Sequence, residues 1–142
     1  MIGIASDHHG VNDKKKIIKY FEENNKKYKD FGPFNEENVD YVDYALDLCN
    51  SLKRGEIEKG ILICKTGIGM SITANKIKGI RCARVLSTED VILTREHNDA
   101  NVIAIPSSIE EEKLLKMIDL FLTTNFIEEE RYIRRRTKLN NL

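Results

Sequence analysis

A cysteine and two glycines stand close together in residues 61–76, which read ILICKTGIGMSITANK. Cys64 ends an apolar run that is typical of a buried strand, and the residues after Gly69 follow a helical pattern. Glycines let the backbone turn sharply, and a helix N-terminus offers unpaired N–H groups and the positive end of a dipole. The same field favours a thiolate. The stretch indicates a reactive cysteine beside an anion site, although a lone strand-end cysteine is more often a small buried hydrophobic residue.

Familiar phosphate-binding motifs do not describe this stretch. The P-loop has four residues between its glycines and then Gly-Lys-Ser/Thr, and neither feature is present. By analogy, a cysteine phosphatase loop has an arginine six residues after its thiol, where this chain has Met70. A phosphatase would therefore lack its main phosphate ligand.

Two further segments carry acid–base groups. DHHG places Asp7, His8 and His9 in one turn, and TREHNDAN places His97 and Asn98 just before a predicted strand. Simpler explanations are an Asp-capped turn with a solvated histidine, and a helix end whose His and Asn satisfy carbonyl groups. These residues are therefore candidates for chemistry and not yet assignments.

Arg131 and Arg135 are four residues apart, so they share one face of the predicted last helix. Such a pair can clamp a phosphate group. The alternative is a solvated basic tail. A nucleic-acid site is disfavoured, because no aromatic platform or wider basic surface accompanies the arginines.

Composition narrows the class of protein. The chain has 142 residues, 41% hydrophobic and 32% charged, with 23 basic and 23 acidic residues. Zero net charge disfavours a general nucleic-acid or membrane-surface binder, and the apolar runs are too short to span a bilayer. Three widely spaced cysteines form neither a disulfide framework nor a zinc pattern, and we find no convincing metal-ligand spacing. We expect one domain over residues 1–142 in the cytoplasm, opening without a leader segment.

Short apolar runs alternate with helical patterns along the whole chain. We expect strands over residues 2–6, 26–31, 60–64, 80–85 and 101–105. Helical patterns cover about residues 11–25, 41–54, 69–78, 88–96 and 108–123, and a final polar helix covers 128–142. Ser108 and Glu111 form a predicted capping box. The alternation predicts an α/β protein with a five-stranded parallel sheet covered on both faces.

The expected strand order places two of these loops together. In the common order 2-1-3-4-5, strands one and three are neighbours at the topological switch point, where ligands bind outside the carboxyl ends of the strands. The loops after these strands are residues 7–10 and 64–69. We expect both to meet there, and residues 32–40, the longest irregular stretch, to border a site.

Taken together, these segments resemble the ribose-5-phosphate isomerase B family, which includes the galactose-6-phosphate isomerase subunits. The resemblance rests on SDHHG, DYVDYA, GILICKTGIGMSITANKIKGIR, REHNDANV and RYIRR, which occur in that order over essentially the whole chain. It implies a three-layer, Rossmann-like α/β/α sandwich with an extra C-terminal helix. It also implies a sugar-phosphate substrate, no cofactor and no metal, and a homodimer or homotetramer.

The resemblance also implies a role for each candidate. Cys64 resembles the base that moves a proton through a cis-enediolate, with Thr66 as a possible proton shuttle. Ring opening falls to His97, assisted by Asp7. The segment Thr66, Gly67, Ile68 and Gly69 resembles an anion hole, Asn98 a substrate hydroxyl contact, and His8, Arg131 and Arg135 phosphate ligands.

The chain departs from the family pattern at two places near the predicted site. Lys65 stands where a small residue is common, and Ser108 replaces a possible phosphate-binding arginine. The sequence predicts an aldose–ketose isomerase for ribose 5-phosphate and ribulose 5-phosphate. Alternatives are galactose 6-phosphate or allose 6-phosphate as substrate, or a non-catalytic phosphate-binding module on the same fold.

Overall fold

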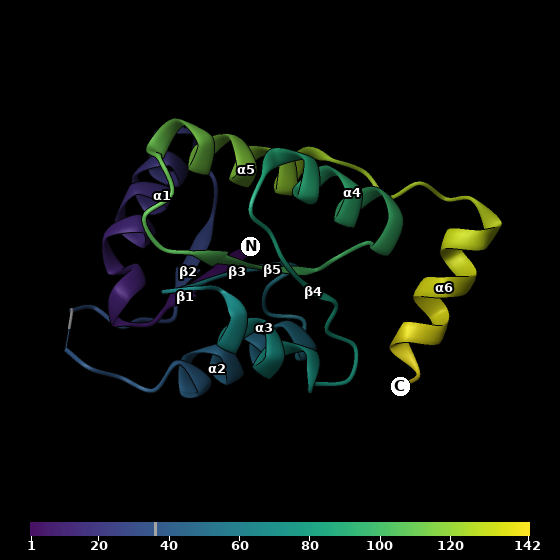
Figure 1. Ribbon diagram of the computed structural model, residues 1–142, viewed down its shortest axis with the longest axis horizontal. Helices are drawn as coiled ribbons and strands as arrows, with labels where there is room; N and C mark the ends of the chain where they lie inside the picture. The colour runs from purple at the N-terminus through teal and green to yellow at the C-terminus, as the bar shows by residue number, and fades with distance from the viewer. Residues whose placement is uncertain (36) are drawn as a thin grey trace.

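The computed structural model describes residues 1–35 and 37–142 and shows a five-stranded parallel sheet between two helix layers (Figure 1). The predicted α/β sandwich with an extra C-terminal helix is confirmed. The strands are β1 (Ile2–Ser6), β2 (Tyr28–Asp30), β3 (Lys59–Cys64), β4 (Cys82–Arg84) and β5 (Val102–Pro106). The helices are the 3-10 turn η1 (His8–Gly10), α1 (Val11–Glu23), α2 (Tyr41–Lys53), α3 (Ile68–Asn75), α4 (Thr88–Asn98), α5 (Glu111–Thr123) and α6 (Glu130–Asn140).

The order of the strands differs from the prediction at one edge. The sheet runs β2-β1-β3-β5-β4, so the predicted order 2-1-3-4-5 is wrong for the last two strands. The first four residues of β5 are buried, whereas the short β4 is half-buried and ends on an exposed arginine. Strands that are apolar on both faces belong inside a parallel sheet, and short polar strands suit its edge. The predicted neighbours β1 and β3 do pair.

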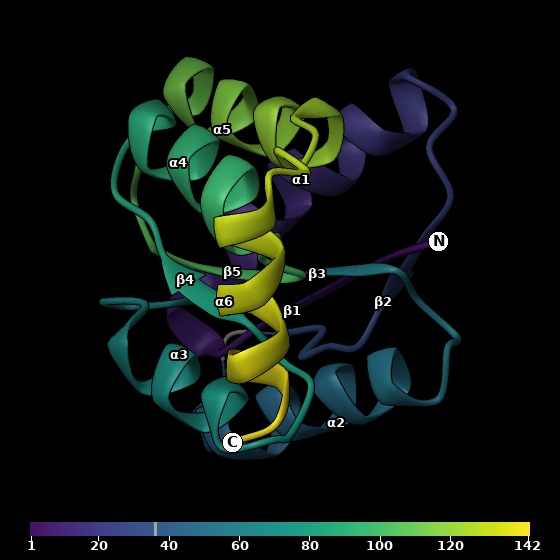
Figure 2. The same ribbon diagram turned by 90° about the vertical axis from the view of Figure 1, so that its right-hand side faces the viewer.

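Side chains alternate along the central strands and build a core on each face. In β3, Ile61 and Ile63 join the core beneath α1, α4 and α5, whereas Leu62 and Cys64 join the core beneath α2 and α3 (Figures 1 and 2). Full burial of such an aliphatic side chain contributes roughly 1.5–3 kcal/mol. β3 is thus held from both faces, and its last residue, Cys64, has a fixed position.

The start of α5 has a different cap from the predicted one. The carboxylate of Glu110 accepts hydrogen bonds from the amides of Glu112 and Lys113, both at 3.0 Å. Ser108 has a φ of +66°, and its amide donates to Asp13 Oδ2 at 3.1 Å. The predicted capping box of Ser108 and Glu111 is therefore wrong, because Ser108 occupies a left-handed turn and not the extended backbone of an N-cap.

α6 lies outside the two helix layers, at the end of the molecule beside β4 (Figure 2). Tyr132 is its buried residue, and Arg136 Nη1 lies 2.7 Å from Asp99 Oδ2 just after α4. Most of its basic face is exposed. Within residues 1–35 and 37–142, no helix combines the length and apolar character needed to cross a membrane.

Candidate active site

A cavity of about 260 Å³ lies where β1 and β3 end side by side. It is lined by Asp7, His8, His9, Val39, Tyr41, Cys64, Lys65, Thr66 and Gly69. The predicted meeting of the two loops is confirmed. A larger cavity of about 520 Å³ lies among α3, β4, α4 and the C-terminus. We place the candidate site in the smaller cavity, because it brings a thiol, a carboxylate and two imidazoles together.

The two site loops approach closely because glycine occupies position 10. The amide of Asp7 donates to the carbonyl of Ile63 at 2.9 Å, which ties the end of β1 to β3. A Cβ on Gly10 would lie 2.7 Å from the same carbonyl oxygen. A larger residue at this position would therefore push the DHHG turn away from the cysteine loop.

Cys64 is held by main-chain groups on both sides. Its residue is 4% exposed, and the amide of Gly67 donates to its Sγ at 3.2 Å. Its carbonyl accepts from the amide of Ser107 at 2.8 Å. These two contacts fix the position of the sulfur beside the turn. The sequence signal of a strand-end cysteine ahead of Gly-x-Gly thus corresponds to a sulfur bound by a backbone donor.

The turn after Cys64 requires both of its glycines. Gly67 has a φ of +75°, and a Cβ there would lie 3.2 Å from the backbone of β5 at Ile105. A Cβ on Gly69 would lie 2.6 Å from the ring of Tyr41. Inside the turn, the amide of Ile68 donates to Thr66 Oγ1 at 3.2 Å. The turn is therefore packed between β5 and α2, with its amides at the start of α3.

His8 is oriented by the loop before α2. The amide of Val39 donates to His8 Nδ1 at 3.4 Å, so the proton of the neutral ring lies on Nε2. His8 thereby presents an N–H donor, which suits an anionic ligand. Residues 32–40 were predicted to border a site, and Val39 confirms this for their described part; Glu36 lies outside the described residues.

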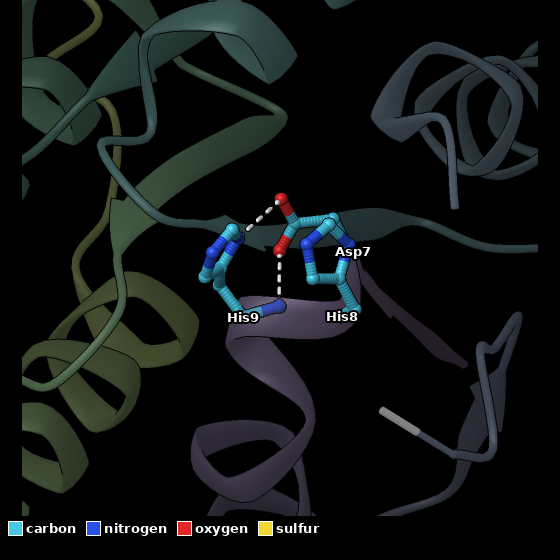
Figure 3. Close-up of side chains that lie close together, drawn as sticks. All are labelled: Asp7, His8 and His9. Carbon is cyan, nitrogen blue, oxygen red and sulfur yellow. Dashed lines mark hydrogen bonds and ion pairs between the residues drawn. The ribbon is translucent and has the colours of Figure 1, made fainter. Parts of the chain in front are cut away.

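Asp7, His8 and His9 also form the one possible metal-ligand cluster among the described residues. Their ligand atoms lie within 4.8 Å of one another, and the imidazoles stand on either side of the carboxylate (Figure 3). The sequence showed no convincing metal-ligand spacing, and the absence of a metal stays a prediction. A metal at His8 Nε2 would have to displace its proton and reverse the contact with Val39, so this orientation suits an anion better than a cation.

The other predicted site residues lie elsewhere in the chain. The ring of His97 stacks on that of Tyr132, with centroids 4.8 Å apart and planes 6° apart. Asn98 accepts a hydrogen bond from Thr94 Oγ1 at 3.1 Å and borders the larger cavity. Arg131 donates to the Tyr132 hydroxyl at 2.9 Å, and Arg135 is exposed.

The topology explains this separation. Cys64 lies at the carboxyl ends of the parallel strands, whereas His97 and Asn98 end α4 just before β5 begins, at the amino ends. The five residues of β5 span about 16 Å at roughly 3.3 Å each. One chain therefore brings together Asp7, His8, Cys64 and the Thr66–Gly69 turn, and does not bring His97, Asn98, Arg131 or Arg135 to them.

An ionic cluster around Asp99 holds α4 and α6, which carry the residues outside the Cys64 cavity. Its carboxylate lies 2.9 Å from Arg95 Nη1 and 2.7 Å from Arg136 Nη1. Burial raises the pKa of Asp99, but hydrogen bonds from Arg136 and Arg95 outweigh burial and leave that pKa below its usual value. The cluster joins the end of α4 to α6, and so places the arginine-bearing helix beside His97.

Sequence reasoning gave no role to three cavity residues. His9 was treated as one of two interchangeable histidines, Val39 as part of an irregular loop, and Tyr41 as a helix start. A weak signal existed for Tyr41, which begins a helix directly after the loop expected to border the site. The contact of Val39 with His8 depends on loop conformation, which residue types do not specify.

Comparison with known proteins gives a consistent result. The family model described as Ribose/Galactose Isomerase matches residues 2–139. A putative sugar phosphate isomerase of Bacillus subtilis is 44% identical over 127 residues, which cover 88% of this chain and 85% of the relative. Ribose-5-phosphate isomerase B of Escherichia coli is 38% identical over 117 residues, which cover 82% and 78%.

Solved structures agree over nearly the whole chain. A ribose 5-phosphate isomerase from Thermotoga maritima superimposes with a TM-score of 0.95 at 39% identity, covering 99% of this chain and 97% of that one. Ribose-5-phosphate isomerase B of Clostridium thermocellum gives a TM-score of 0.94 at 38% identity, covering 99% and 95%.

Proposed function

This chain belongs to the ribose/galactose isomerase family, and we propose that it interconverts ribose 5-phosphate and ribulose 5-phosphate. The observation that carries the proposal is the Cys64 sulfur bound by the Gly67 amide in the cavity that Asp7 and His8 also line. The names of the relatives from Escherichia coli and Thermotoga maritima support this substrate. The reaction moves a proton between two carbons of one sugar, which requires no redox cofactor.

In the proposed mechanism, Cys64 as thiolate removes the proton from C2 of the open aldose. The electron pair forms the C1–C2 double bond of a cis-enediolate, while the carbonyl oxygen on C1 takes up negative charge. The same sulfur then returns the proton to C1 as the ketone forms at C2. One base is enough, because a single group on one face of the planar cis-enediolate can reach both C1 and C2.

Backbone amides stabilise the enediolate in this proposal. The turn from Thr66 to Gly69 leads into α3, which begins at Ile68, so its amides lie at the positive end of the helix dipole. Removal of one such donor typically lowers the rate ~10²–10³-fold. Thr66 is proposed to move the hydroxyl proton between the two substrate oxygens, since this residue lines the same cavity.

We further propose that a second copy of the chain completes the site. Phosphate binding is assigned to His8, Arg131 and Arg135, and ring opening and a hydroxyl contact to His97 and Asn98. Four of these five residues lie on the α4–α6 side, away from the Cys64 cavity. A two-fold axis would place the α4–α6 face of one copy over the cavity of the other.

The experiment is a panel of kcat/KM values for ribose 5-phosphate, galactose 6-phosphate and allose 6-phosphate. We expect ribose 5-phosphate to be preferred, and Cys64→Ala to lower kcat at least ~10²–10⁴-fold. Cys82→Ala is the matched control, because it removes a thiol on β4 outside the cavity. Normal turnover by folded Cys64→Ala would contradict the mechanism. A preference for a six-carbon sugar would mean that galactose 6-phosphate or allose 6-phosphate is the substrate. If no sugar is turned over, the protein would be a non-catalytic phosphate-binding module.

A further inference from the structure

His9 has no part in the mechanism above, yet it makes the closest contact to the Asp7 carboxylate. Its Nδ1 lies 3.5 Å from Asp7 Oδ2, and its amide donates to Asp7 Oδ1 at 2.9 Å (Figure 3). The Asp7 side chain is 8% exposed and that of His9 is 42% exposed. A buried carboxylate thus holds a solvent-accessible imidazole at the edge of the cavity.

The two neighbouring histidines carry opposite tautomers. His8 Nδ1 accepts from the amide of Val39, which leaves the proton on Nε2. His9 Nδ1 faces a carboxylate, which can only accept, so its proton lies on Nδ1 and its Nε2 has a free electron pair. His8 can therefore donate a hydrogen bond from Nε2, and His9 can accept a proton at Nε2. Their rings lie 4.1 Å apart, and both residues line the Cys64 cavity.

A cyclic sugar needs such a base before the proton transfer at C2 can begin. Opening a furanose ring removes a proton from the O1 hydroxyl, breaks the C1–O4 bond and protonates O4. Cys64 has its own proton to move, and His97 lies at the opposite edge of the sheet in the same chain. His9 lines the Cys64 cavity within one chain.

We propose that His9 is the catalytic base that removes the O1 proton during ring opening, with Asp7 holding its tautomer. The proton passes to His9 Nε2, the electrons of the C1–O4 bond pass to O4, and O4 takes a proton from His97 of the second copy. The His9 proton returns to solvent between turnovers, as His97 is reprotonated. This inference rests on the proposed isomerase function.

The test compares a cyclic with an acyclic substrate. Ribose 5-phosphate is mostly a furanose, whereas ribulose 5-phosphate cannot form that ring because its O5 carries the phosphate. His9→Gln keeps a donor near Asp7 and removes the base. We expect kcat/KM for ribose 5-phosphate to fall about 10–100-fold, within the range of general base catalysis. Exchange of the C1 proton of ribulose 5-phosphate in D₂O should stay within about twofold of wild type.

A second variant tests the tautomer. Asp7→Asn preserves the cap on the DHHG turn but offers an amide donor to His9 Nδ1, which moves the ring proton to Nε2. Asp7→Asn should also lower turnover of ribose 5-phosphate much more than exchange on ribulose 5-phosphate. The double variant His9→Gln/Asp7→Asn should lose no more activity than either single variant. His97 is proposed to protonate O4, so His97→Asn should also lower turnover of ribose 5-phosphate more than exchange on ribulose 5-phosphate.

The outcomes separate this inference from the proposed function. Equal losses on both substrates in folded His9→Gln, or no loss on either, would overturn the role of His9 while leaving the isomerase intact. Wild-type protein that processes neither sugar would overturn the proposed function, and this inference with it. Selective loss on ribose 5-phosphate in both variants would support the assignment.

Discussion

The candidate residues at the carboxyl ends of the strands and those at the amino ends are held by different means. We call these two regions the carboxyl edge and the amino edge. At the carboxyl edge, the backbone positions the chemistry: the Gly67 amide binds Cys64, and the Ile63 carbonyl anchors Asp7. At the amino edge, side chains hold one another through the stack of His97 on Tyr132 and the ion pairs of Asp99. Under the proposed function, the carboxyl edge performs proton transfer within its own chain and the amino edge binds phosphate for a second copy.

The largest expected effect comes from separating the two edges between chains. Cys64→Ala damages the carboxyl edge, and the double variant Arg131→Ala/Arg135→Ala damages the α6 face. Each should be nearly inactive at low substrate concentration. After equal mixing and subunit exchange, a heterodimer has one site with both defects and one with neither, so about a quarter of wild-type activity should return. Activity is measured before and after exchange.

The control for this experiment is a mixture of two variants with defects at the same edge, Cys64→Ala with Thr66→Ala. Both defects lie in the same cavity, so each site of a mixed dimer keeps one of them and no intact site is formed. Subunit exchange is verified by native mass spectrometry of the mixed sample. Continued inactivity of the first mixture after verified exchange would mean that the arginines act within their own chain, and the shared site would be refuted.

The arginines alone should affect substrate binding more than chemistry. Arg131 and Arg135 lie on the exposed face of α6, and phosphate is remote from the reacting carbons. Each single change to Ala should raise KM about 10–100-fold with a smaller fall in kcat, because phosphate binding is largely uniform between ground and transition states. Arg134→Ala on the same helix is the matched control. A fall in kcat without a change in KM would argue against phosphate binding.

The sequence predicted the carboxyl edge better than the amino edge, for a physical reason. Cys64, Gly67 and Gly69 lie within one stretch of six residues, so their relationship is local, and the pairing of β1 with β3 completes the cavity. The swap of β4 and β5 follows from their different burial. Arg81 and Arg84 in the β4 region were a sequence signal for an edge strand, but the prediction used the common strand order instead. That α4 ends at the amino edge follows from its place before β5, although the family roles of His97 and Asn98 gave no hint of it.

A moderate effect on stability is expected from Asp99→Asn at the amino edge. Asp99 has a φ of +49°, which asparagine also tolerates, so the backbone should be unaffected. The change leaves Arg95, whose side chain is 8% exposed, without its carboxylate partner. We expect a loss of about 1–3 kcal/mol in the free energy of unfolding near pH 7, measured by urea denaturation.

The pH dependence of this loss follows from the lowered pKa of Asp99. A carboxyl group with a depressed folded-state pKa stabilises the fold above its unfolded pKa of about 3.9, and this contribution disappears as pH falls through the folded-state value. The difference between wild type and Asp99→Asn should therefore shrink below about pH 4. Glu56→Gln is the control, because its exposed ion pair with Arg54 contributes little stability. An equal loss in both variants would remove any special role for the Asp99 cluster.

The smallest effect should have the opposite sign and lies at the carboxyl edge. Among the described residues, Ser6 Oγ is the buried side-chain polar atom without a hydrogen-bond partner, and its residue is 0% exposed. A buried hydroxyl without a partner lowers stability, so Ser6→Ala should raise the free energy of unfolding by about 0.5–1 kcal/mol. The Asp99 cluster is paired on all sides, whereas the edge that carries Asp7 and Cys64 retains an unpaired group one residue from the site. If Ser6→Ala stabilises the protein and also lowers kcat, the hydroxyl serves the reaction at the expense of stability. A clear loss of stability would mean that the hydroxyl has a hydrogen-bond partner. The buried polar groups of the two edges would then be equally well hydrogen-bonded.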